Sequence, residues 1–100
     1  MTTTEYEQYV ETRCKPFTDF NYCVVALNGE AGEVAEWHKK YNLRGNILDL
    51  SVEDLKEELG DVLFYLTRAA SLKGWSLVDI MEGNKKKLDD RVNKGYKQVG

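Results

Sequence analysis

Two long segments of this chain repeat apolar residues at the spacing of an α-helix. In residues 20–41 and 51–73 these positions are Phe20, Val24, Leu27, Ala31, Val34, Leu55, Leu59, Val62, Leu66 and Ala69. Such spacing places each set on one face of a helix. Strand-like alternation is not convincing anywhere in the chain, which contains a single proline. The pattern therefore predicts an all-α fold with two long central helices.

Helix-start signals predict a shorter helix before the first long one, over about residues 5–13. Thr4 and Glu7 stand three positions apart, which is the spacing of a capping box. Thr18 or Asp19 is expected to cap the second helix, because both side chains accept hydrogen bonds from free backbone N–H groups.

The third and fourth helices also carry end signals. Ser51 is expected to begin the third helix, and Gly74 to end it. Ser76 and Asp79 have the spacing to cap a fourth helix, which ends before Gly95. The sequence thus predicts a four-helix bundle-like arrangement.

The length and composition limit the class of protein. One hundred residues allow one domain, expected over residues 1–100. No apolar run approaches the roughly 20 residues that span a bilayer. The start of the chain lacks the basic and apolar stretches of a signal peptide, so a cytoplasmic protein is expected.

Charge is unevenly distributed. Residues 30–61 contain nine acidic and four basic residues, whereas residues 82–100 contain three acidic and six basic residues. A nucleic-acid-binding protein needs a broad positive surface, so this class is not expected. The distribution instead permits the acidic residues within 30–61 to bind cations and the basic residues within 82–100 to bind an anion.

Two carboxylate pairs occur on the two long helices. Glu30 and Glu33 stand three apart, as do Glu58 and Asp61, so each pair shares one helix surface beside the apolar stripe. If the stripes pack together, the four acids face one another. Two carboxylates about 5 Å apart repel by roughly 3 kcal/mol at an effective dielectric of about 20. Oxygen ligands without His or Cys favour Mg²⁺, with Mn²⁺ as an alternative.

The glycines inside both carboxylate pairs support the same interpretation of a functional site. Gly32 and Gly60 each cost roughly 1 kcal/mol relative to alanine in a helix. A close approach of backbone or ligand explains such a cost, and a solvated face does not. The alternative is that all four acids are ordinary surface residues, which repel each other by less than about 1 kcal/mol in water.

The chain resembles the MazG-like nucleotide pyrophosphohydrolases over roughly residues 20–92. The resemblance rests on Glu30-Ala-Gly-Glu33, Glu57-Glu58-Leu-Gly-Asp61 and Asn84-Lys-Lys-Lys87-Leu-Asp-Asp-Arg91. Members of this family are all-α and hydrolyse nucleoside triphosphates to the monophosphate and pyrophosphate. The resemblance implies that Glu30, Glu33, Glu58 and Asp61 bind Mg²⁺. It also implies that one of them, or Glu57, activates the attacking water.

Residues on the fourth helix are candidates for binding substrate. Asn84, Lys87 and Arg91 share one helix face, where an ammonium and a guanidinium group can hold phosphate oxygens. In the family, the matching Asn and Lys contact substrate. Lys85 and Lys86 lie off this face and are expected in solvent. The alternative is that the whole stretch is a solvated basic face.

Candidates for recognising the base are aromatic or polar. Trp37 ranks first for stacking, because it lies nearest the carboxylate side of its helix. The other candidates are Phe17, Asn21, His38 and Trp75. Aromatic residues at helical spacing are more commonly part of a core.

Association of subunits is also expected. Apolar residues outside the main stripes predict an isologous homodimer; they are Val25, Leu63, Phe64, Tyr65 and Leu72. The resemblance implies a dimer or a dimer of dimers, which is a homotetramer.

The expected activity is Mg²⁺-dependent hydrolysis of (deoxy)nucleoside triphosphates between the α- and β-phosphates. A related hydrolase specific for deoxyuridine or deoxycytidine nucleotides remains open, and so does a helical protein that binds or senses a nucleotide without turnover. A ferritin-like di-iron protein is disfavoured, because it needs Glu-x-x-His motifs, and His38 is five residues past Glu33.

Overall fold

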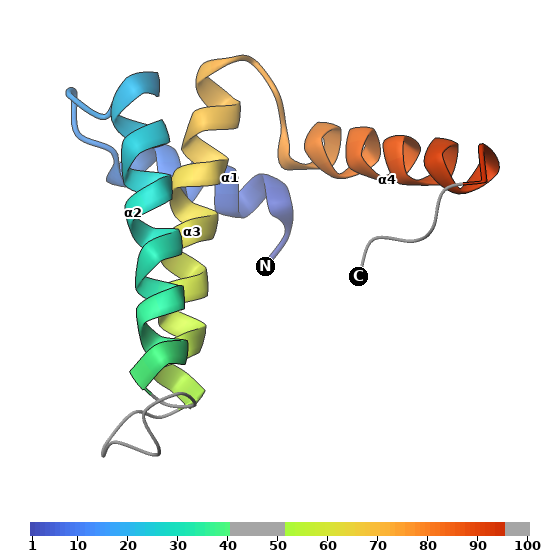
Figure 1. Ribbon diagram of the computed structural model, residues 1–100. Coiled ribbons are helices and arrows are strands. Elements are labelled where there is room, and N and C mark those ends of the chain that lie inside the picture. Colours follow the sequence, from blue (N-terminus) through green and yellow to red (C-terminus); the bar gives the residue numbers. More distant parts are fainter. Residues whose placement is uncertain (41–51, 96–100) are drawn as a thin grey trace.

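The computed structural model describes residues 1–40 and 52–95. Within these ranges the chain forms helices and no strand, which confirms the all-α fold. The helices are α1 (Thr3–Arg13), α2 (Phe20–His38), α3 (Val52–Leu72) and α4 (Leu77–Asn93) (Figure 1). None of these helices is long and apolar enough to cross a membrane. The predicted cap at Ser51 lies outside the described residues.

Helix α1 begins earlier than predicted. Its capping box joins Thr2 and Glu5: the Thr2 hydroxyl accepts a hydrogen bond from Glu5 N–H at 3.1 Å, and the Glu5 carboxylate accepts one from Thr2 N–H at 2.9 Å. The predicted box of Thr4 and Glu7 was therefore wrong. The Thr-x-x-Glu spacing occurs twice, and the earlier pair caps the helix while Glu7 is engaged elsewhere, as described below.

The other described helix ends agree with the sequence analysis. Asp19 caps α2 by accepting a hydrogen bond from Tyr22 N–H at 2.8 Å. Gly74 follows α3 with a φ of 80°, a conformation that glycine adopts without strain. Ser76 and Asp79 form the predicted capping box of α4.

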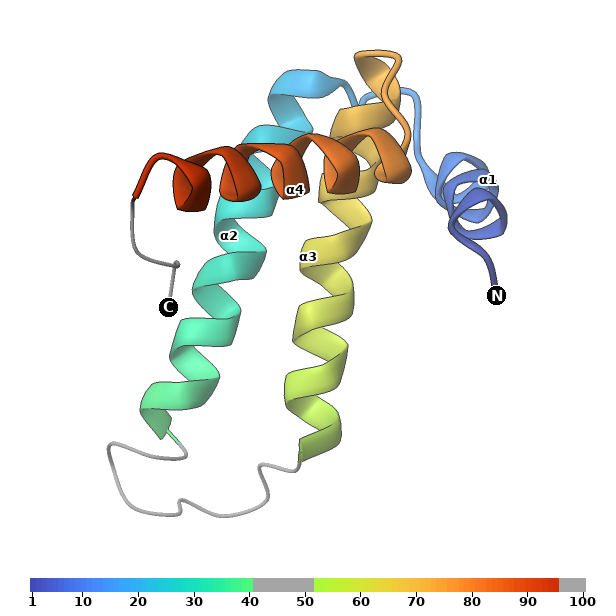
Figure 2. The ribbon, with the colours of Figure 1, turned by 90° about the vertical axis from the view of Figure 1, so that its right-hand side faces the viewer.

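The fold is organised around α2 and α3, which run antiparallel and side by side (Figure 2). Helices α1 and α2 both pack against α3 and do not contact each other, and the buried side chains gather around the end of α3, from α1, the beginning of α2 and the beginning of α4. The buried side chains are Val10, Thr18, Cys23, Thr67, Ala70 and Leu77. Thr67 is buried without loss of hydrogen bonding, because its hydroxyl donates to the Leu63 carbonyl at 2.7 Å.

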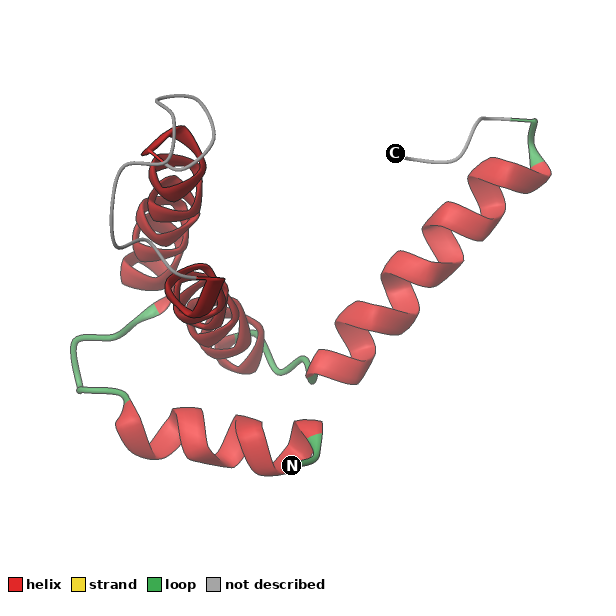
Figure 3. Ribbon diagram, turned by 90° about the horizontal axis from the view of Figure 1, so that it is seen from below, coloured by secondary structure: helices red, strands yellow, loops and turns green. Residues whose placement is uncertain are grey.

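Helix α4 points away from the α2–α3 pair (Figures 1 and 3). It contacts α1 and α3, but none of its Cα atoms lies within 8 Å of a Cα atom of α2. The radius of gyration is 16.4 Å, compared with about 13 Å for a compact domain of this length. Helices α1, α2 and α3 pack together, but a single chain does not close a four-helix bundle.

Candidate metal centre

Three carboxylates converge between the two long helices. Glu30 comes from α2, whereas Glu58 and Asp61 stand three residues apart on α3. Each offers one oxygen, and these oxygens all lie within 4.8 Å of one another. The antiparallel packing of α2 and α3 thus brings together three of the four acids that the sequence analysis assigned to a metal.

The cluster is electrostatically unfavourable when it holds only carboxylates. Burial, followed by the charges of Asp61, Glu58 and Glu33, raises the pKa of Glu30 above that of an exposed glutamate. Burial and the neighbouring charges, Glu33 foremost, likewise raise the pKa of Glu58. A bound cation would relieve this repulsion.

The donor set fits a hard divalent cation. In octahedral coordination of Mg²⁺ at about 2.0–2.1 Å, adjacent oxygen ligands lie about 2.9 Å apart and opposite ligands about 4.2 Å apart. The three carboxylate oxygens, within 4.8 Å of one another, would have to move closer together to bind one ion. The cluster contains no His or Cys, which suits Mg²⁺ or Mn²⁺. Three carboxylates also leave coordination positions free for water and phosphate.

The remaining predicted acids, Glu33 and Glu57, lie beside the cluster. They line a cavity of about 190 Å³ that also borders Glu58. The other lining residues are Glu36, Trp37, Lys40 and Asp54. Trp37, the first-ranked candidate for stacking, therefore lies next to the carboxylates.

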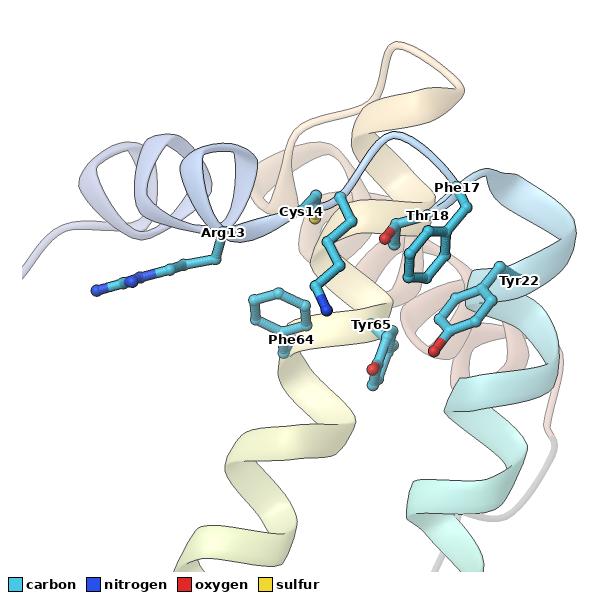
Figure 4. A pocket seen from close by; sticks show the side chains of 8 residues that line it. Arg13, Cys14, Phe17, Thr18, Tyr22, Phe64 and Tyr65 are labelled. Carbon is cyan, nitrogen blue, oxygen red and sulfur yellow. The ribbon is translucent and has the colours of Figure 1, made fainter.

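A second cavity, of about 230 Å³, lies between the α1–α2 connection, the beginning of α2 and the middle of α3 (Figure 4). Its lining residues are Arg13, Cys14, Lys15, Phe17, Thr18, Tyr22, Phe64 and Tyr65. The rings of Phe17 and Tyr22 meet edge to face with centroids 5.5 Å apart, and Tyr22 lies 6.2 Å from Tyr65. Lys15 Nζ lies 5.7 Å from the Phe17 centroid. The cavity is therefore aromatic, with positive charge at its edge.

Tyr65 connects this aromatic cavity to the acidic cluster. Burial is the main cause of its raised pKa, followed by Tyr22 and by the charges of Glu30 and Asp61. The sequence pattern places Tyr65 only among the residues expected at a subunit contact, although Tyr65 stands one helical turn after Asp61 and on the same face. Lys15 had no comparable signal, because it reaches the cavity from the α1–α2 connection.

The predicted substrate residues of α4 lie elsewhere in this structure. Asn84, Lys87 and Arg91 are exposed on a helix that points away from the α2–α3 pair (Figure 3). One chain therefore does not bring them to the acidic cluster.

The cations of α4 fall into two groups. Lys85 pairs with Asp89 at 2.6 Å and Lys86 with Asp90 at 2.8 Å, both within the helix. Lys87 forms no ion pair with any residue in the described ranges, and neither does Arg91 at the next turn. This division agrees with the expected separation of a solvated face from a face able to bind an anion.

The remaining candidates lie outside both cavities. Asn21, His38 and Trp75 are all exposed. A Cβ atom built at Gly32 or Gly60 meets no heavy atom of another part of the described chain within 4 Å. The expected close approach of backbone at these glycines was therefore wrong for a single chain, since these helix faces are open.

Together these features define an all-α protein with a candidate divalent-cation centre between two antiparallel helices. The family model of the MazG nucleotide pyrophosphohydrolase domain matches residues 20–96, so the chain belongs to this family. Among curated proteins, the chain is similar to the Gene 37 protein of Mycobacterium phage L5. The two are 33% identical over 87 residues, covering 85% of this chain and 76% of the phage protein. No solved structure gave a significant match.

Proposed function

We propose that this protein hydrolyses nucleoside triphosphates between the α- and β-phosphates, giving the nucleoside monophosphate and pyrophosphate. The observation that carries the proposal is the convergence of Glu30, Glu58 and Asp61 inside the matched family domain. Mg²⁺ is the proposed metal, and Mn²⁺ is expected to substitute for it.

The acids divide into two roles. Glu30, Glu58 and Asp61 would hold the ion, which neutralises phosphate charge and lowers the pKa of water. Glu33 or Glu57, beside the cluster, would accept the proton of the attacking water. The water oxygen forms a bond to the α-phosphorus as the bond to the bridging oxygen breaks, and pyrophosphate leaves.

The aromatic cavity is the proposed position of the nucleoside. Phe17, Tyr22 and Tyr65 offer rings on which a base can stack, and Tyr65 places this cavity beside the acidic cluster. Lys15 and Arg13 add positive charge at its edge. Trp37, on the other side of the cluster, is the alternative stacking residue.

Exposed apolar surface supports the association of two copies. Fourteen large apolar side chains are exposed in the described residues. They include Val25 at 73% and Leu63 and Leu72 near 40%, three positions from which association was expected. Isolated exposed apolar residues are ordinary, but so many on a chain with a small core indicate a partner.

We infer that the partner is a second copy and that α4 is the element exchanged between copies. One face of α4 carries Ile80, Met81, Asn84, Lys87 and Arg91 at helical spacing, so apolar groups and unpaired cations lie together. This face is complementary to the acidic and apolar α2–α3 pair. Docking there would bring Lys87 and Arg91 to a triphosphate held by the other copy, in a homodimer or a dimer of dimers.

The decisive experiment incubates the protein with a panel of ribo- and deoxynucleoside triphosphates and Mg²⁺, with and without a chelator. Monophosphate and pyrophosphate that disappear on chelation would support the proposal and reveal the preferred base. Diphosphate and phosphate would contradict the proposed cleavage position. Tight binding without any product would support the alternative, a nucleotide-binding or sensing protein.

A further inference from the structure

A side chain of α1 binds the first backbone N–H group of α4. Glu7 Oε2 accepts a hydrogen bond from Leu77 N–H at 3.0 Å, in a partly buried position that joins residues 70 apart. Leu77 itself is buried. The adjacent Ser76 and Asp79 cap each other, so the first turn of α4 is held both locally and by α1.

The rest of α4 packs much less closely against the other helices than its first turn does. Of its apolar side chains beyond Leu77, Leu88 is half-buried, whereas Val78, Ile80, Met81 and Val92 have 36–52% of their surface accessible. No Cα atom of α4 lies within 8 Å of a Cα atom of α2. Within one chain, the direction of α4 is therefore determined mainly at its first turn.

A small change at that turn has a large effect at the other end of the helix. Arg91 lies fourteen residues after Leu77, which corresponds to about 21 Å along a helix. A tilt of about 10° at Leu77 would displace Arg91 by about 4 Å. Misplacement of a binding group by about 1 Å already weakens its action substantially.

We propose that Glu7 is a positioning residue that sets the direction of α4 and so the placement of Lys87 and Arg91. Its effect on substrate rests on the function proposed above, whereas its effect on α4 does not. Glu7 belongs to α1, which precedes the matched family domain at residues 20–96. In this chain, a helix outside the matched region, α1, therefore holds the beginning of α4 through Glu7.

The chemistry of the contact suits this role. A carboxylate accepts a hydrogen bond from an N–H group at the start of a helix and also interacts favourably with the positive end of the helix dipole. Glutamine keeps an oxygen acceptor of similar reach but loses the charge. Alanine removes the acceptor while retaining high helix propensity in α1.

The test compares Glu7→Ala and Glu7→Gln with Glu11→Ala, a matched control at an exposed acid one turn further along α1. Residual dipolar couplings of backbone amides report the orientation of residues 77–93 relative to 52–72 in solution. We expect Glu7→Ala to shift or scale down the couplings of α4 only, with Glu7→Gln and the control close to wild type. Unchanged α4 couplings in Glu7→Ala would overturn the proposal.

Kinetics provide the second readout. Glu7→Ala should raise KM for the triphosphate about tenfold while kcat stays within about twofold, and Glu7→Gln should restore most of the affinity. A reoriented α4 with an unchanged KM would overturn the role in substrate binding. If the wild type hydrolyses no triphosphate, the proposed function fails, and the dipolar couplings still decide whether Glu7 positions α4.

Discussion

Glu30 on α2 and Glu58 on α3 present carboxylate oxygens within 4.8 Å of each other, and the charge of Glu58 contributes to the raised pKa of Glu30. Packing of the two helices holds this repulsive pair together. Perturbed carboxylates that converge from two elements are typical of functional sites rather than of solvated surfaces. The pair therefore provides the most direct target for mutation.

Replacement of Glu58 by glutamine should reduce hydrolysis by about a hundredfold or more, because the cluster loses one of its three charges for the metal. Helical circular dichroism should not change. Pyrophosphate release measures the loss. Glu53→Gln is the matched control, since Glu53 lies on α3 with its side chain 75% exposed. Full activity in Glu58→Gln would remove this residue from the metal site.

Mixing two inactive variants tests whether two copies share a site. If α4 of one copy serves the acidic cluster of the other, Glu58→Gln mixed with Lys87→Ala restores one intact site in each hybrid dimer. Random assortment then recovers about a quarter of wild-type activity. If α4 serves its own cluster, mixing restores nothing. Lys85→Ala is the control for Lys87→Ala, because Lys85 is already paired with Asp89.

The metal-free protein should be more stable at about pH 5 than at about pH 7. Glu30 and Glu58 have higher pKa values when folded than when unfolded. At pH values between the unfolded-state pKa and the folded-state pKa of these two groups, the folded state therefore binds more protons than the unfolded state. The free energy of unfolding consequently falls as the pH rises through this range. The resulting destabilisation is fully present above the folded pKa and is relieved as the pH falls through it.

Urea denaturation in chelator at the two pH values measures this difference. Mg²⁺ at about pH 7 should remove most of it, because the cation replaces the protons as the group that offsets the repulsion. Metal-free stability that rises toward neutral pH would contradict the prediction.

Alanine at Gly60 should raise the free energy of unfolding by about 1 kcal/mol, since no heavy atom from another part of the described chain lies within 4 Å of the added Cβ atom. Hydrolysis should nevertheless fall, because we expect substrate or the second copy to approach this open helix face. Gly83→Ala provides the comparison for stability, because Gly83 is also unobstructed and lies within a helix, α4. Wild-type activity in Gly60→Ala would show that no group approaches Gly60.

Features that depend on interactions between residues close in sequence, such as helix caps, are predicted well from the sequence. Asp19, Ser76 and Asp79 cap helices through hydrogen bonds that span three residues, so residue type and spacing predict them. The spacing of Glu58 and Asp61 likewise predicts a shared face. Glu7 shows the limit of this reasoning, because two identical Thr-x-x-Glu spacings compete and a tertiary partner 70 residues away engages the second glutamate.

Residue type and spacing alone predict the all-α class, most helix ends and the acids that could form a cation site, because helix periodicity and capping depend on neighbours within a turn or two. The three-dimensional arrangement was needed to establish that Glu30 meets Glu58 and Asp61, that Tyr65 joins an aromatic cavity to them, and that α4 points away from the packed pair. These relationships depend on how helices pack, and that depends on contacts between residues far apart in the chain.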